Sequence, residues 1–259
     1  MLEARSVTIA ARLDGISFEL EQGTITAICG PNGAGKSSLI EALAGLLAVE
    51  GDVWLDGAAL ATLAPRERAR RIGYLPQHGE VAWDLSVRAL AALGRLPHGD
   101  RAQGPVERAL AALDLAELAD RPVSTLSGGE RARALLARVF AGEPRWILAD
   151  EPLAALDLAH QLALLGHLRR AADGGTGVVL VLHDLALAMN HASRVLVFDK
   201  GRLAVDGPPE TAQSEETIAR VWGVPARRAE FSCPSARAGF RPGASRGGRR
   251  RPLRPAPAG

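Results

Sequence analysis

The chain has 259 residues with a formal net charge of +2, and 47% of them are hydrophobic. Such a chain can bury a sizeable core in one lobed unit but is short for two independent domains, and its two cysteines give no disulfide framework. Because no apolar run approaches the roughly 18 residues that span a bilayer, and the first residues lack the layout of a secretory signal, we expect a cytoplasmic chain.

The positive charge is concentrated at the end of the chain. Residues 232–259 hold seven arginines and no acidic residue, so taking those seven from the net +2 leaves −5 for residues 1–231. This stretch is also rich in Pro, Gly, Ser and Ala, which predicts a disordered tail. A basic tail can touch nucleic acid or anionic lipid headgroups, but its composition favours a solvated extension.

The first part of the chain is rich in short segments typical of β-strands, separated by Gly and Asp turns. They are Val7–Ile9, Ile16–Leu20, Ile25–Cys29 and Val53–Leu55. The third is uniformly apolar and leads directly into a glycine-rich stretch. This pattern favours a buried strand that ends at a loop.

Residues 30–37 match the pattern G-x-x-x-x-G-K-[ST], and a helical stretch, Ser37–Leu47, follows. Glycines at this spacing let backbone N–H groups surround phosphates, while the lysine reaches the outer phosphates and the serine coordinates Mg²⁺. A helix N-terminus also favours a bound anion. We therefore expect a phosphate-binding loop made by Gly30, Pro31, Asn32, Gly33, Ala34, Gly35, Lys36, Ser37 and Ser38.

The middle of the chain changes character after Gln77, which follows the strand-like segment Ile72–Leu75. From Ser86 to about Ala141, Ala and Leu recur at helical spacing. The simplest organisation is an α/β core with a helical insert over about residues 78–141. Its predicted helices cover Val87–Leu93, Val106–Leu113 and Arg131–Val139.

The stretch Leu126–Glu130 opens the last of these helices with a serine and two glycines. It predicts a second helix N-terminus that can bind an anion. Ser127 and Glu130 also have the S-x-x-E spacing of a capping box, so this stretch by itself favours an ordinary helix start.

Two apolar, strand-like runs then follow, Trp146–Asp150 and Val178–Leu182. The first ends in Asp150 and Glu151, which places carboxylates at the carboxyl edge of a parallel sheet beside the phosphate loop. Asp150 is suited to hold Mg²⁺ together with Ser37, and Glu151 to act as the general base for water. Alone, an acidic strand end is as often a helix cap or a surface turn.

Together these motifs resemble the ATP-binding cassette (ABC) ATPases over about residues 1–225. Residues 30–37 and 146–151 are similar to their Walker motifs, and Leu126–Glu130 is similar to their signature. The resemblance implies a P-loop NTPase core of class α/β, with an N-terminal antiparallel β subdomain and an inserted helical subdomain, over residues 1–231. It also implies that two cassettes pack head to tail around ATP and Mg²⁺, so this chain must pair, most simply with itself.

Further residues match the family by position. The resemblance implies that Gln77 contacts Mg²⁺ and water, and that His183 contacts the γ-phosphate and orients the general base. It implies that the nucleotide bound by one protomer is contacted by four residues of the other, Ser127, Gly128, Gly129 and Glu130. It also implies that the loop joining the two active sites is made by Ala155, Leu156 and Asp157. As isolated residues, Gln77 and His183 would more often be a surface amide and a strand-end histidine.

The segment Leu93–His98 suggests a branch of the family. It resembles the G-R-x-P-H segment of cassettes that drive uptake of ferric siderophores, haem and cobalamin, and Val221–Val224 resembles their C-terminal region. The alternative is a helix-ending turn with a solvated His98. An importer ATPase implies a separate permease, a substrate-binding protein that acts through the permease, and a place at the cytoplasmic face of the membrane.

Two other classes stay open for such a cassette. One is a soluble ATPase that acts on nucleic acid or ribosomes, although no nucleic acid is expected as a partner because the body of the chain is acidic. The other is the ATPase of a multi-subunit exporter.

The stretch Val7–Arg12 lacks the aromatic residue that many family members stack on adenine. Arg12 could stack on the base instead. We therefore expect weak discrimination between ATP and GTP.

Overall fold

The computed structural model describes residues 1–77, 84–154 and 156–225. All of these belong to the first of two compact units, Met1–Ala226. The predicted tail over residues 232–259 and the first residues of the predicted helical insert lie outside the described residues. Within the described residues, no helix has the length and apolar character needed to cross a membrane.

An antiparallel sheet forms the N-terminal part, with the strand order β2-β1-β4-β5. Its strands contain the predicted segments but are longer, because polar positions that interrupt the apolar pattern are satisfied inside the fold. Glu3 is 1% exposed, and Arg5 donates to its carboxylate at 3.0 Å while stacking over Trp54. The bounds are Leu2–Ile9 for β1, Leu13–Leu20 for β2, Glu50–Leu55 for β4 and Ala58–Ala59 for β5.

A second sheet of mainly parallel strands carries the predicted buried runs, with the order β10-β9-β3-β8-β7-β6. The prediction of buried central strands is confirmed, because every residue of β3, β7 and β8 is buried. Only β10 runs antiparallel to its neighbour. The bounds are Ile25–Cys29 for β3, Ile72–Leu75 for β6, Trp146–Asp150 for β7, Gly177–Val181 for β8, Arg194–Asp199 for β9 and Arg202–Gly207 for β10.

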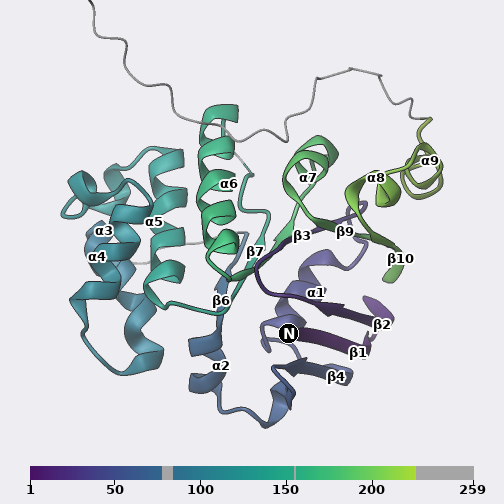
Figure 1. The fold of residues 1–259 in the computed structure, drawn as a ribbon, viewed down its shortest axis with the longest axis horizontal. Helices are drawn as coiled ribbons and strands as arrows, with labels where there is room; N and C mark the ends of the chain where they lie inside the picture. Colours follow the sequence, from purple (N-terminus) through teal and green to yellow (C-terminus); the bar gives the residue numbers. More distant parts are fainter. Residues whose placement is uncertain (78–83, 155, 226–259) are drawn as a thin grey trace, which may run out of the picture. The chain divides into compact units, whose positions relative to one another are not determined.

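Each face of the parallel sheet is covered by its own hydrophobic cluster. Alternate strand residues such as Ile28 and Val179 pack with the antiparallel sheet and α1. Their neighbours such as Ala27 and Val178 pack with the helical part of the chain. Figure 1 shows the antiparallel sheet and the helical insert at opposite sides of the core.

The helices of the core follow its strands. Helix α1 ends four residues before the predicted Leu47, where Gly45 takes a left-handed conformation with φ of 71°. The bounds are Lys36–Leu43 for α1, Pro65–Arg71 for α2, Leu158–Asp173 for α6, Leu185–His191 for α7, Pro209–Ala212 for α8 and Glu215–Trp222 for α9.

The three helices predicted for the insert are present, namely α3 (Val87–Ala92), α4 (Gln103–Ala112) and α5 (Gly128–Ala141). Both α3 and α4 pack against α5. The 3-10 helix η2 (Leu93–His98) directly continues α3. Two short 3-10 helices, η3 (Ala116–Leu118) and η4 (Val123–Thr125), join α4 to α5. A third, η1 (Leu60–Thr62), lies outside the insert, between β5 and α2.

The segment Leu93–His98 does end a helix, at Gly99 in a left-handed conformation, but the solvated side chain of that alternative is wrong for His98, which is half-buried. Arg95 is buried and binds Asp100 at 2.7 Å, Glu143 at 3.1 Å and the carbonyl of Ala141 at 3.1 Å. The ring of His98 lies 3.0 Å from the carbonyl oxygen of Gly142. These contacts tie η2 to the carbonyl-rich end of α5, where donors are needed.

Helix α2 holds the other side of η2. Arg66 and Arg70 both donate to the carbonyl of Pro97, at 2.6 and 2.8 Å. Gly94 packs directly against the backbone of Arg138 in α5, where a side chain has no room. The helical insert is thus tied to the core through η2.

We expect Gly94→Ala to lower the free energy of unfolding by about 1–3 kcal/mol, because the added methyl group meets the Arg138 carbonyl. The matched control is Gly166→Ala in α6, where the nearest neighbouring atom is 3.8 Å away. In that variant the free energy of unfolding should rise by roughly 0.5–1 kcal/mol, because alanine reduces the entropy of the unfolded chain. Urea denaturation measures both, and equal stability of the two variants would contradict the close packing.

Candidate nucleotide-binding site

The glycine-rich loop joins β3 to α1, and two of its glycines lie so close to the backbone of other segments that a side chain would not fit. Gly30 and Gly35 have φ of 152° and 97°. A Cβ at Gly30 would clash with the carbonyl of Phe198, and one at Gly35 would lie 2.6 Å from the carbonyl oxygen of Arg12. The loop therefore ends with Gly35 as the N-cap of α1, whose first N–H groups have no acceptor within the helix.

Lys36 lies folded into its own loop. Its ammonium group donates to the carbonyls of Gly30 and Pro31, both at 2.8 Å. Burial lowers its pKa, while the carboxylates of Glu151 and Asp150 partly offset this effect. An ammonium held by neutral carbonyls is available to an anion, since phosphate oxygens are stronger acceptors.

Asp150 ends β7 and is 4% exposed. Burial raises its pKa, and a hydrogen bond with Ser37 opposes this rise. Its Oδ1 atom is buried without a hydrogen-bond partner, which is costly unless a cation or water binds there. This acceptor, together with Ser37 and Gln77, fits the oxygen ligands that Mg²⁺ takes beside phosphates.

No group of three or more His, Cys, Asp and Glu side chains in the described part of the chain could hold a metal ion. The fit to Mg²⁺ therefore relies on one carboxylate, a hydroxyl and an amide. Such a site needs water and phosphate oxygens to complete six ligands.

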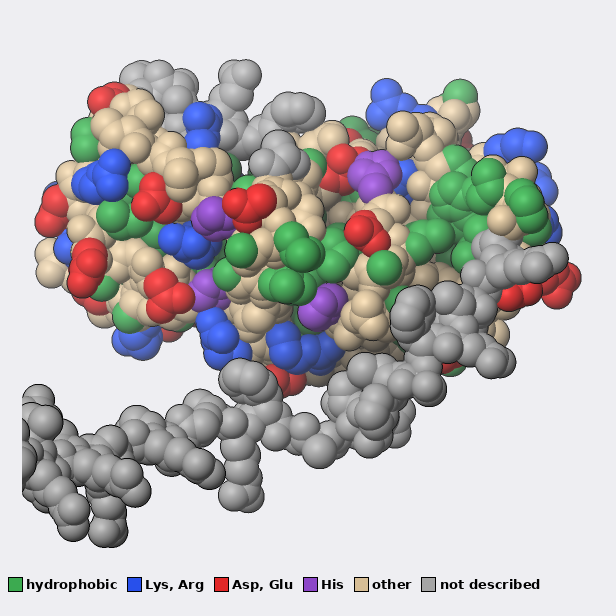
Figure 2. All heavy atoms as spheres, turned by 90° about the horizontal axis from the view of Figure 1, so that it is seen from above, with side chains coloured by type: hydrophobic (Ala, Val, Ile, Leu, Met, Phe, Trp, Pro, Cys, Tyr) green, Lys and Arg blue, Asp and Glu red, His purple; other side chains and the backbone are tan. Residues whose placement is uncertain are grey.

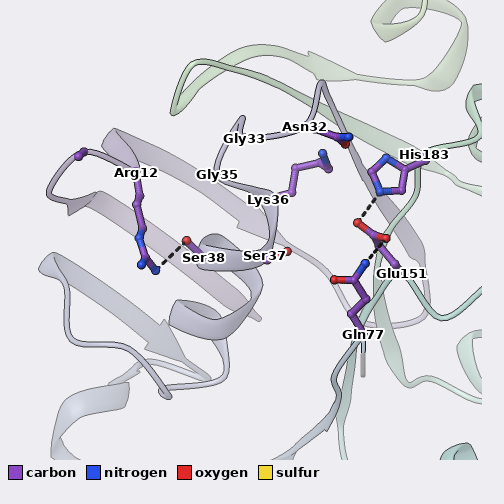
Figure 3. Close-up of a pocket in the computed structure, with 11 residues that line it drawn as sticks. Arg12, Asn32, Gly33, Gly35, Lys36, Ser37, Ser38, Gln77, Glu151 and His183 are labelled. Atoms are coloured by element: carbon purple, nitrogen blue, oxygen red, sulfur yellow. Dashed lines mark hydrogen bonds and ion pairs between the residues drawn. The ribbon is translucent and has the colours of Figure 1, made fainter. Parts of the chain in front are cut away.

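Glu151 is held from both sides. Gln77 donates from Nε2 to Oε2 of Glu151 at 2.6 Å, and Nε2 of His183 makes a close contact with Oε1. Figure 3 shows the three side chains pointing toward one another at the edge of the cavity. The backbone of Glu151 has φ of 49°, an unfavourable value for a non-glycine residue. Strain of this kind is typical of functional sites.

Asp184 is a positioning residue that the sequence analysis missed. It is the N-cap of α7, and its Oδ1 accepts hydrogen bonds from the N–H groups of Ala186 and Leu187, at 2.8 and 3.1 Å. It thus fixes the turn that carries His183. The available signal was an aspartate directly before an apolar helical stretch.

These groups share one cavity of about 500 Å³. Nine of the predicted site residues line it, and two further residues, Ala11 and Arg12, come from the turn between β1 and β2 (Figure 3). The nine are Asn32, Gly33, Gly35, Lys36, Ser37, Ser38, Gln77, Glu151 and His183.

The predicted signature residues do not line this cavity. Ser127 caps α5, and a complete capping box joins it to Glu130. The expectation of an ordinary helix start at this stretch is therefore confirmed. Asp157 caps α6 by accepting from the N–H of His160 at 2.9 Å. Gly129 packs against the ring of His160, which leaves no space for a side chain and joins the start of α5 to α6. Ala155 lies outside the described residues.

The family model described as ABC transporter matches residues 13–154, which is more than half of the chain. This chain belongs to the ABC transporter family. The hemin import ATP-binding protein HmuV of Myxococcus xanthus is 42% identical over 240 residues, which are 86% of this chain and 90% of that protein. HmuV of Nocardia farcinica is 45% identical over 219 residues, which are 82% of this chain and 76% of that protein.

Solved structures agree with this family. A transporter assigned to the metal-chelate type, in an inward-facing conformation, has a TM-score of 0.77 at 27% identity and covers 86% of this chain and 89% of that one. A bacterial Atm1-family ABC exporter with ATP bound has a TM-score of 0.73 at 28% identity, but only 41% of its chain is covered. The protein is therefore an ATP-binding subunit of this family and an ATPase coupled to transport.

We expect Glu151→Gln to lower the ATP hydrolysis rate by about 10²–10⁴-fold, because an amide cannot take the proton of the attacking water. ATP binding should persist, since the phosphate loop is intact. Phosphate release and nucleotide binding are measured in parallel. Glu216→Gln, on the remote helix α9, is the control of equal charge. Unchanged hydrolysis by Glu151→Gln would show that Glu151 is not the base.

Proposed function

We propose that this chain is the ATP-hydrolysing subunit of an ABC importer, with haem, a ferric siderophore or cobalamin as the cargo of its permease. The observation that carries the proposal is Glu151, held by Gln77 and His183 at the edge of the cavity that also holds the phosphate loop. Relatives named hemin import proteins favour haem among these cargoes.

The phosphate loop would bind the triphosphate through its backbone N–H groups, and Lys36 would move from the carbonyls of Gly30 and Pro31 to the outer phosphates. Asp150, Ser37 and Gln77 would hold Mg²⁺. When bound, that ion neutralises negative charge on the β- and γ-phosphates.

Glu151 would take a proton from the water that attacks the γ-phosphorus. The water oxygen forms the new bond, and the bond to the oxygen between the β- and γ-phosphorus atoms breaks, giving ADP and phosphate. Gln77 and His183 each contact one carboxylate oxygen of Glu151, which orients this base before the nucleotide arrives. Because it is held in this way, the carboxylate of Glu151 needs little rearrangement to take the proton of the attacking water.

A second copy of the chain would complete the site. Ser127, Gly128, Gly129 and Glu130 begin a helix outside the cavity of their own chain, so another protomer has to present them to the nucleotide. Leu158 and Leu162, one turn apart on α6 beside Asp157, are 65% and 45% exposed. Hydrophobic side chains gather in patches between charged ones on the face in Figure 2, as surfaces that meet a partner do.

A permease would dock on a groove of about 450 Å³ between α2, η2 and α5. The groove is mainly apolar, and its lining includes Tyr74, Pro76, Leu93, Leu96 and Val139. Leu96 is 70% exposed, and Pro76 directly precedes Gln77. A helix of the permease here would reach the segment that contacts Glu151. As the partner of a permease, this protein would be a peripheral subunit at the cytoplasmic face of the membrane.

The importer has more support than the other two classes. The relatives described above are named as import proteins, and the ATP-bound exporter shares only part of its length with this chain. A substrate-binding protein would act indirectly, through the permease. No nucleic acid is expected as a partner.

Two inactive variants should complement each other if each site combines Lys36 of one protomer with Ser127 of the other. Lys36→Ala and Ser127→Arg are each expected to lack ATPase activity. In a 1:1 mixture, half of the dimers carry one intact site, so the activity should recover to about a quarter of the wild-type value. A mixture that stays inactive would contradict a shared site.

The docking groove is tested by capture from detergent-solubilised native membranes, with tagged Glu151→Gln protein and ATP. We expect a polytopic permease to be recovered. Adding Leu96→Glu should reduce its recovery by at least about tenfold, because a charge is buried at the interface. Adding Leu46→Glu is the control, since Leu46 is 60% exposed and lies outside the groove. Recovery of ribosomes or nucleic acid instead would favour the soluble class.

A further inference from the structure

The groove between α2, η2 and α5 is apolar except at one position. Arg138, in the last turn of α5, is the one charged residue among the described residues that line it. The other lining residues are apolar or glycine, and of these Tyr74 alone has a hydroxyl group. Arg138 is half-buried, and burial lowers its pKa. A cation in such surroundings is costly unless an anion compensates it.

The chain itself supplies no such anion to Arg138. Among residues 1–77, 84–154 and 156–225, no side chain forms an ion pair or a hydrogen bond with its guanidinium. Glu143 lies between two lining residues in the sequence, but its carboxylate is bound by Arg95 at 3.1 Å and by Arg108 at 2.7 Å. The acidic residue best placed to compensate Arg138 is therefore already used.

The end of α5 does not need this guanidinium either. A cation in the last turn of a helix commonly binds the carbonyls that are free there. Here Arg95 donates to the carbonyl of Ala141 at 3.1 Å, and the ring of His98 lies 3.0 Å from the carbonyl oxygen of Gly142. Arg138 makes neither contact, so its side chain is left for a partner outside the chain.

The rim of the groove at Pro97 is also basic. Arg66 and Arg70 both donate to the carbonyl of Pro97, which is a lining residue. No carboxylate in the described part of the chain forms an ion pair with either of them, whereas the neighbouring Arg71 pairs with Glu67 at 2.5 Å. Three guanidinium groups thus lie in or beside an apolar groove, and a complementary partner combines apolar side chains with negative charge.

We propose that the permease segment bound in this groove carries an aspartate or glutamate whose carboxylate pairs with Arg138. The inference rests on the proposed docking of a permease. Apolar side chains of the same segment would pack on Leu93, Leu96 and Val139, as an amphipathic helix does in a groove. The ion pair would be shielded from water and would fix the register of the segment, because a guanidinium binds a carboxylate through two parallel hydrogen bonds. A permease with a basic residue at that position would be rejected.

The low lysine content of this chain makes the contact testable by cross-linking. Lys36 and Lys200 are its only lysines, and a carbodiimide joins a carboxylate to an amine but not to a guanidinium. Tagged protein with Glu151→Gln and Arg138→Lys is incubated with ATP and detergent-solubilised native membranes and then treated with the carbodiimide. We expect an amide bond between the introduced amine and an Asp or Glu of the permease, identified by mass spectrometry. Arg101→Lys, at an exposed position of the insert outside the groove, is the matched control and should not give this product.

A second measurement removes the charge. Adding Arg138→Gln to the tagged Glu151→Gln protein should reduce recovery of the permease by at least about tenfold, because the permease carboxylate is then buried without a partner. Arg138→Lys keeps the positive charge and should retain most of the recovery. If thermal melting shows that the glutamine variant is unfolded, the cross-link from Arg138→Lys decides alone.

The outcomes separate this inference from the docking proposal. Loss of recovery with Leu96→Glu but not with Arg138→Gln, without a cross-link from Arg138→Lys, would overturn the ion pair and leave the docking groove in place. Recovery of no permease by the Glu151→Gln protein would contradict the proposed function and this inference with it. If Arg138→Gln leaves permease recovery unchanged but weakens flotation with phosphatidylglycerol vesicles, the anion is a lipid headgroup and the inference is wrong.

Discussion

The pairing of three parallel strands determines where the chemistry of this protein lies. Val181 of β8 is in register with Ile28 of β3 on one side and with Asp150 of β7 on the other. The next residues of each strand therefore emerge at one edge of the sheet: the phosphate loop, Glu151 and the turn that carries His183. Residues separated by more than a hundred positions meet because hydrogen bonds fix this register.

The buried charges near this edge depend on each other. Lys36 and Asp150 are both buried, and each shifts the other toward its charged form against the effect of burial. Burial raises the pKa of Cys29 to about 12, so the thiol beneath the loop stays neutral and adds no negative charge. Two cations, Lys36 and Arg12, and two carboxylates, Glu151 and Asp150, thus lie in or beside a space that suits a polyanion with its metal.

The elements that the sequence predicted best are those decided by local pattern. Uniformly apolar runs identified β3 and β7 with their observed bounds, and glycine spacing identified the loop. The missing parts depend on distant partners. Glu3 is buried because β1 pairs on both sides, with β2 and with β4, whose Trp54 lies opposite Glu3. The 3-10 helix η2 is held by Arg95, which binds Glu143 in another part of the chain. No local pattern shows that Ala11 belongs to the site, and the pattern at Asp184 indicates only a helix N-cap.

The contact between Gly129 and His160 has a consequence for a protein that works as a pair. The start of α5 would face the nucleotide of the partner, whereas α6 is capped by Asp157, three residues before His160. Since Gly129 and the His160 ring are packed without space between them, a displacement of either helix start moves the other. Binding at one site would then change the affinity at the second, and by thermodynamic linkage the influence must be equal in both directions.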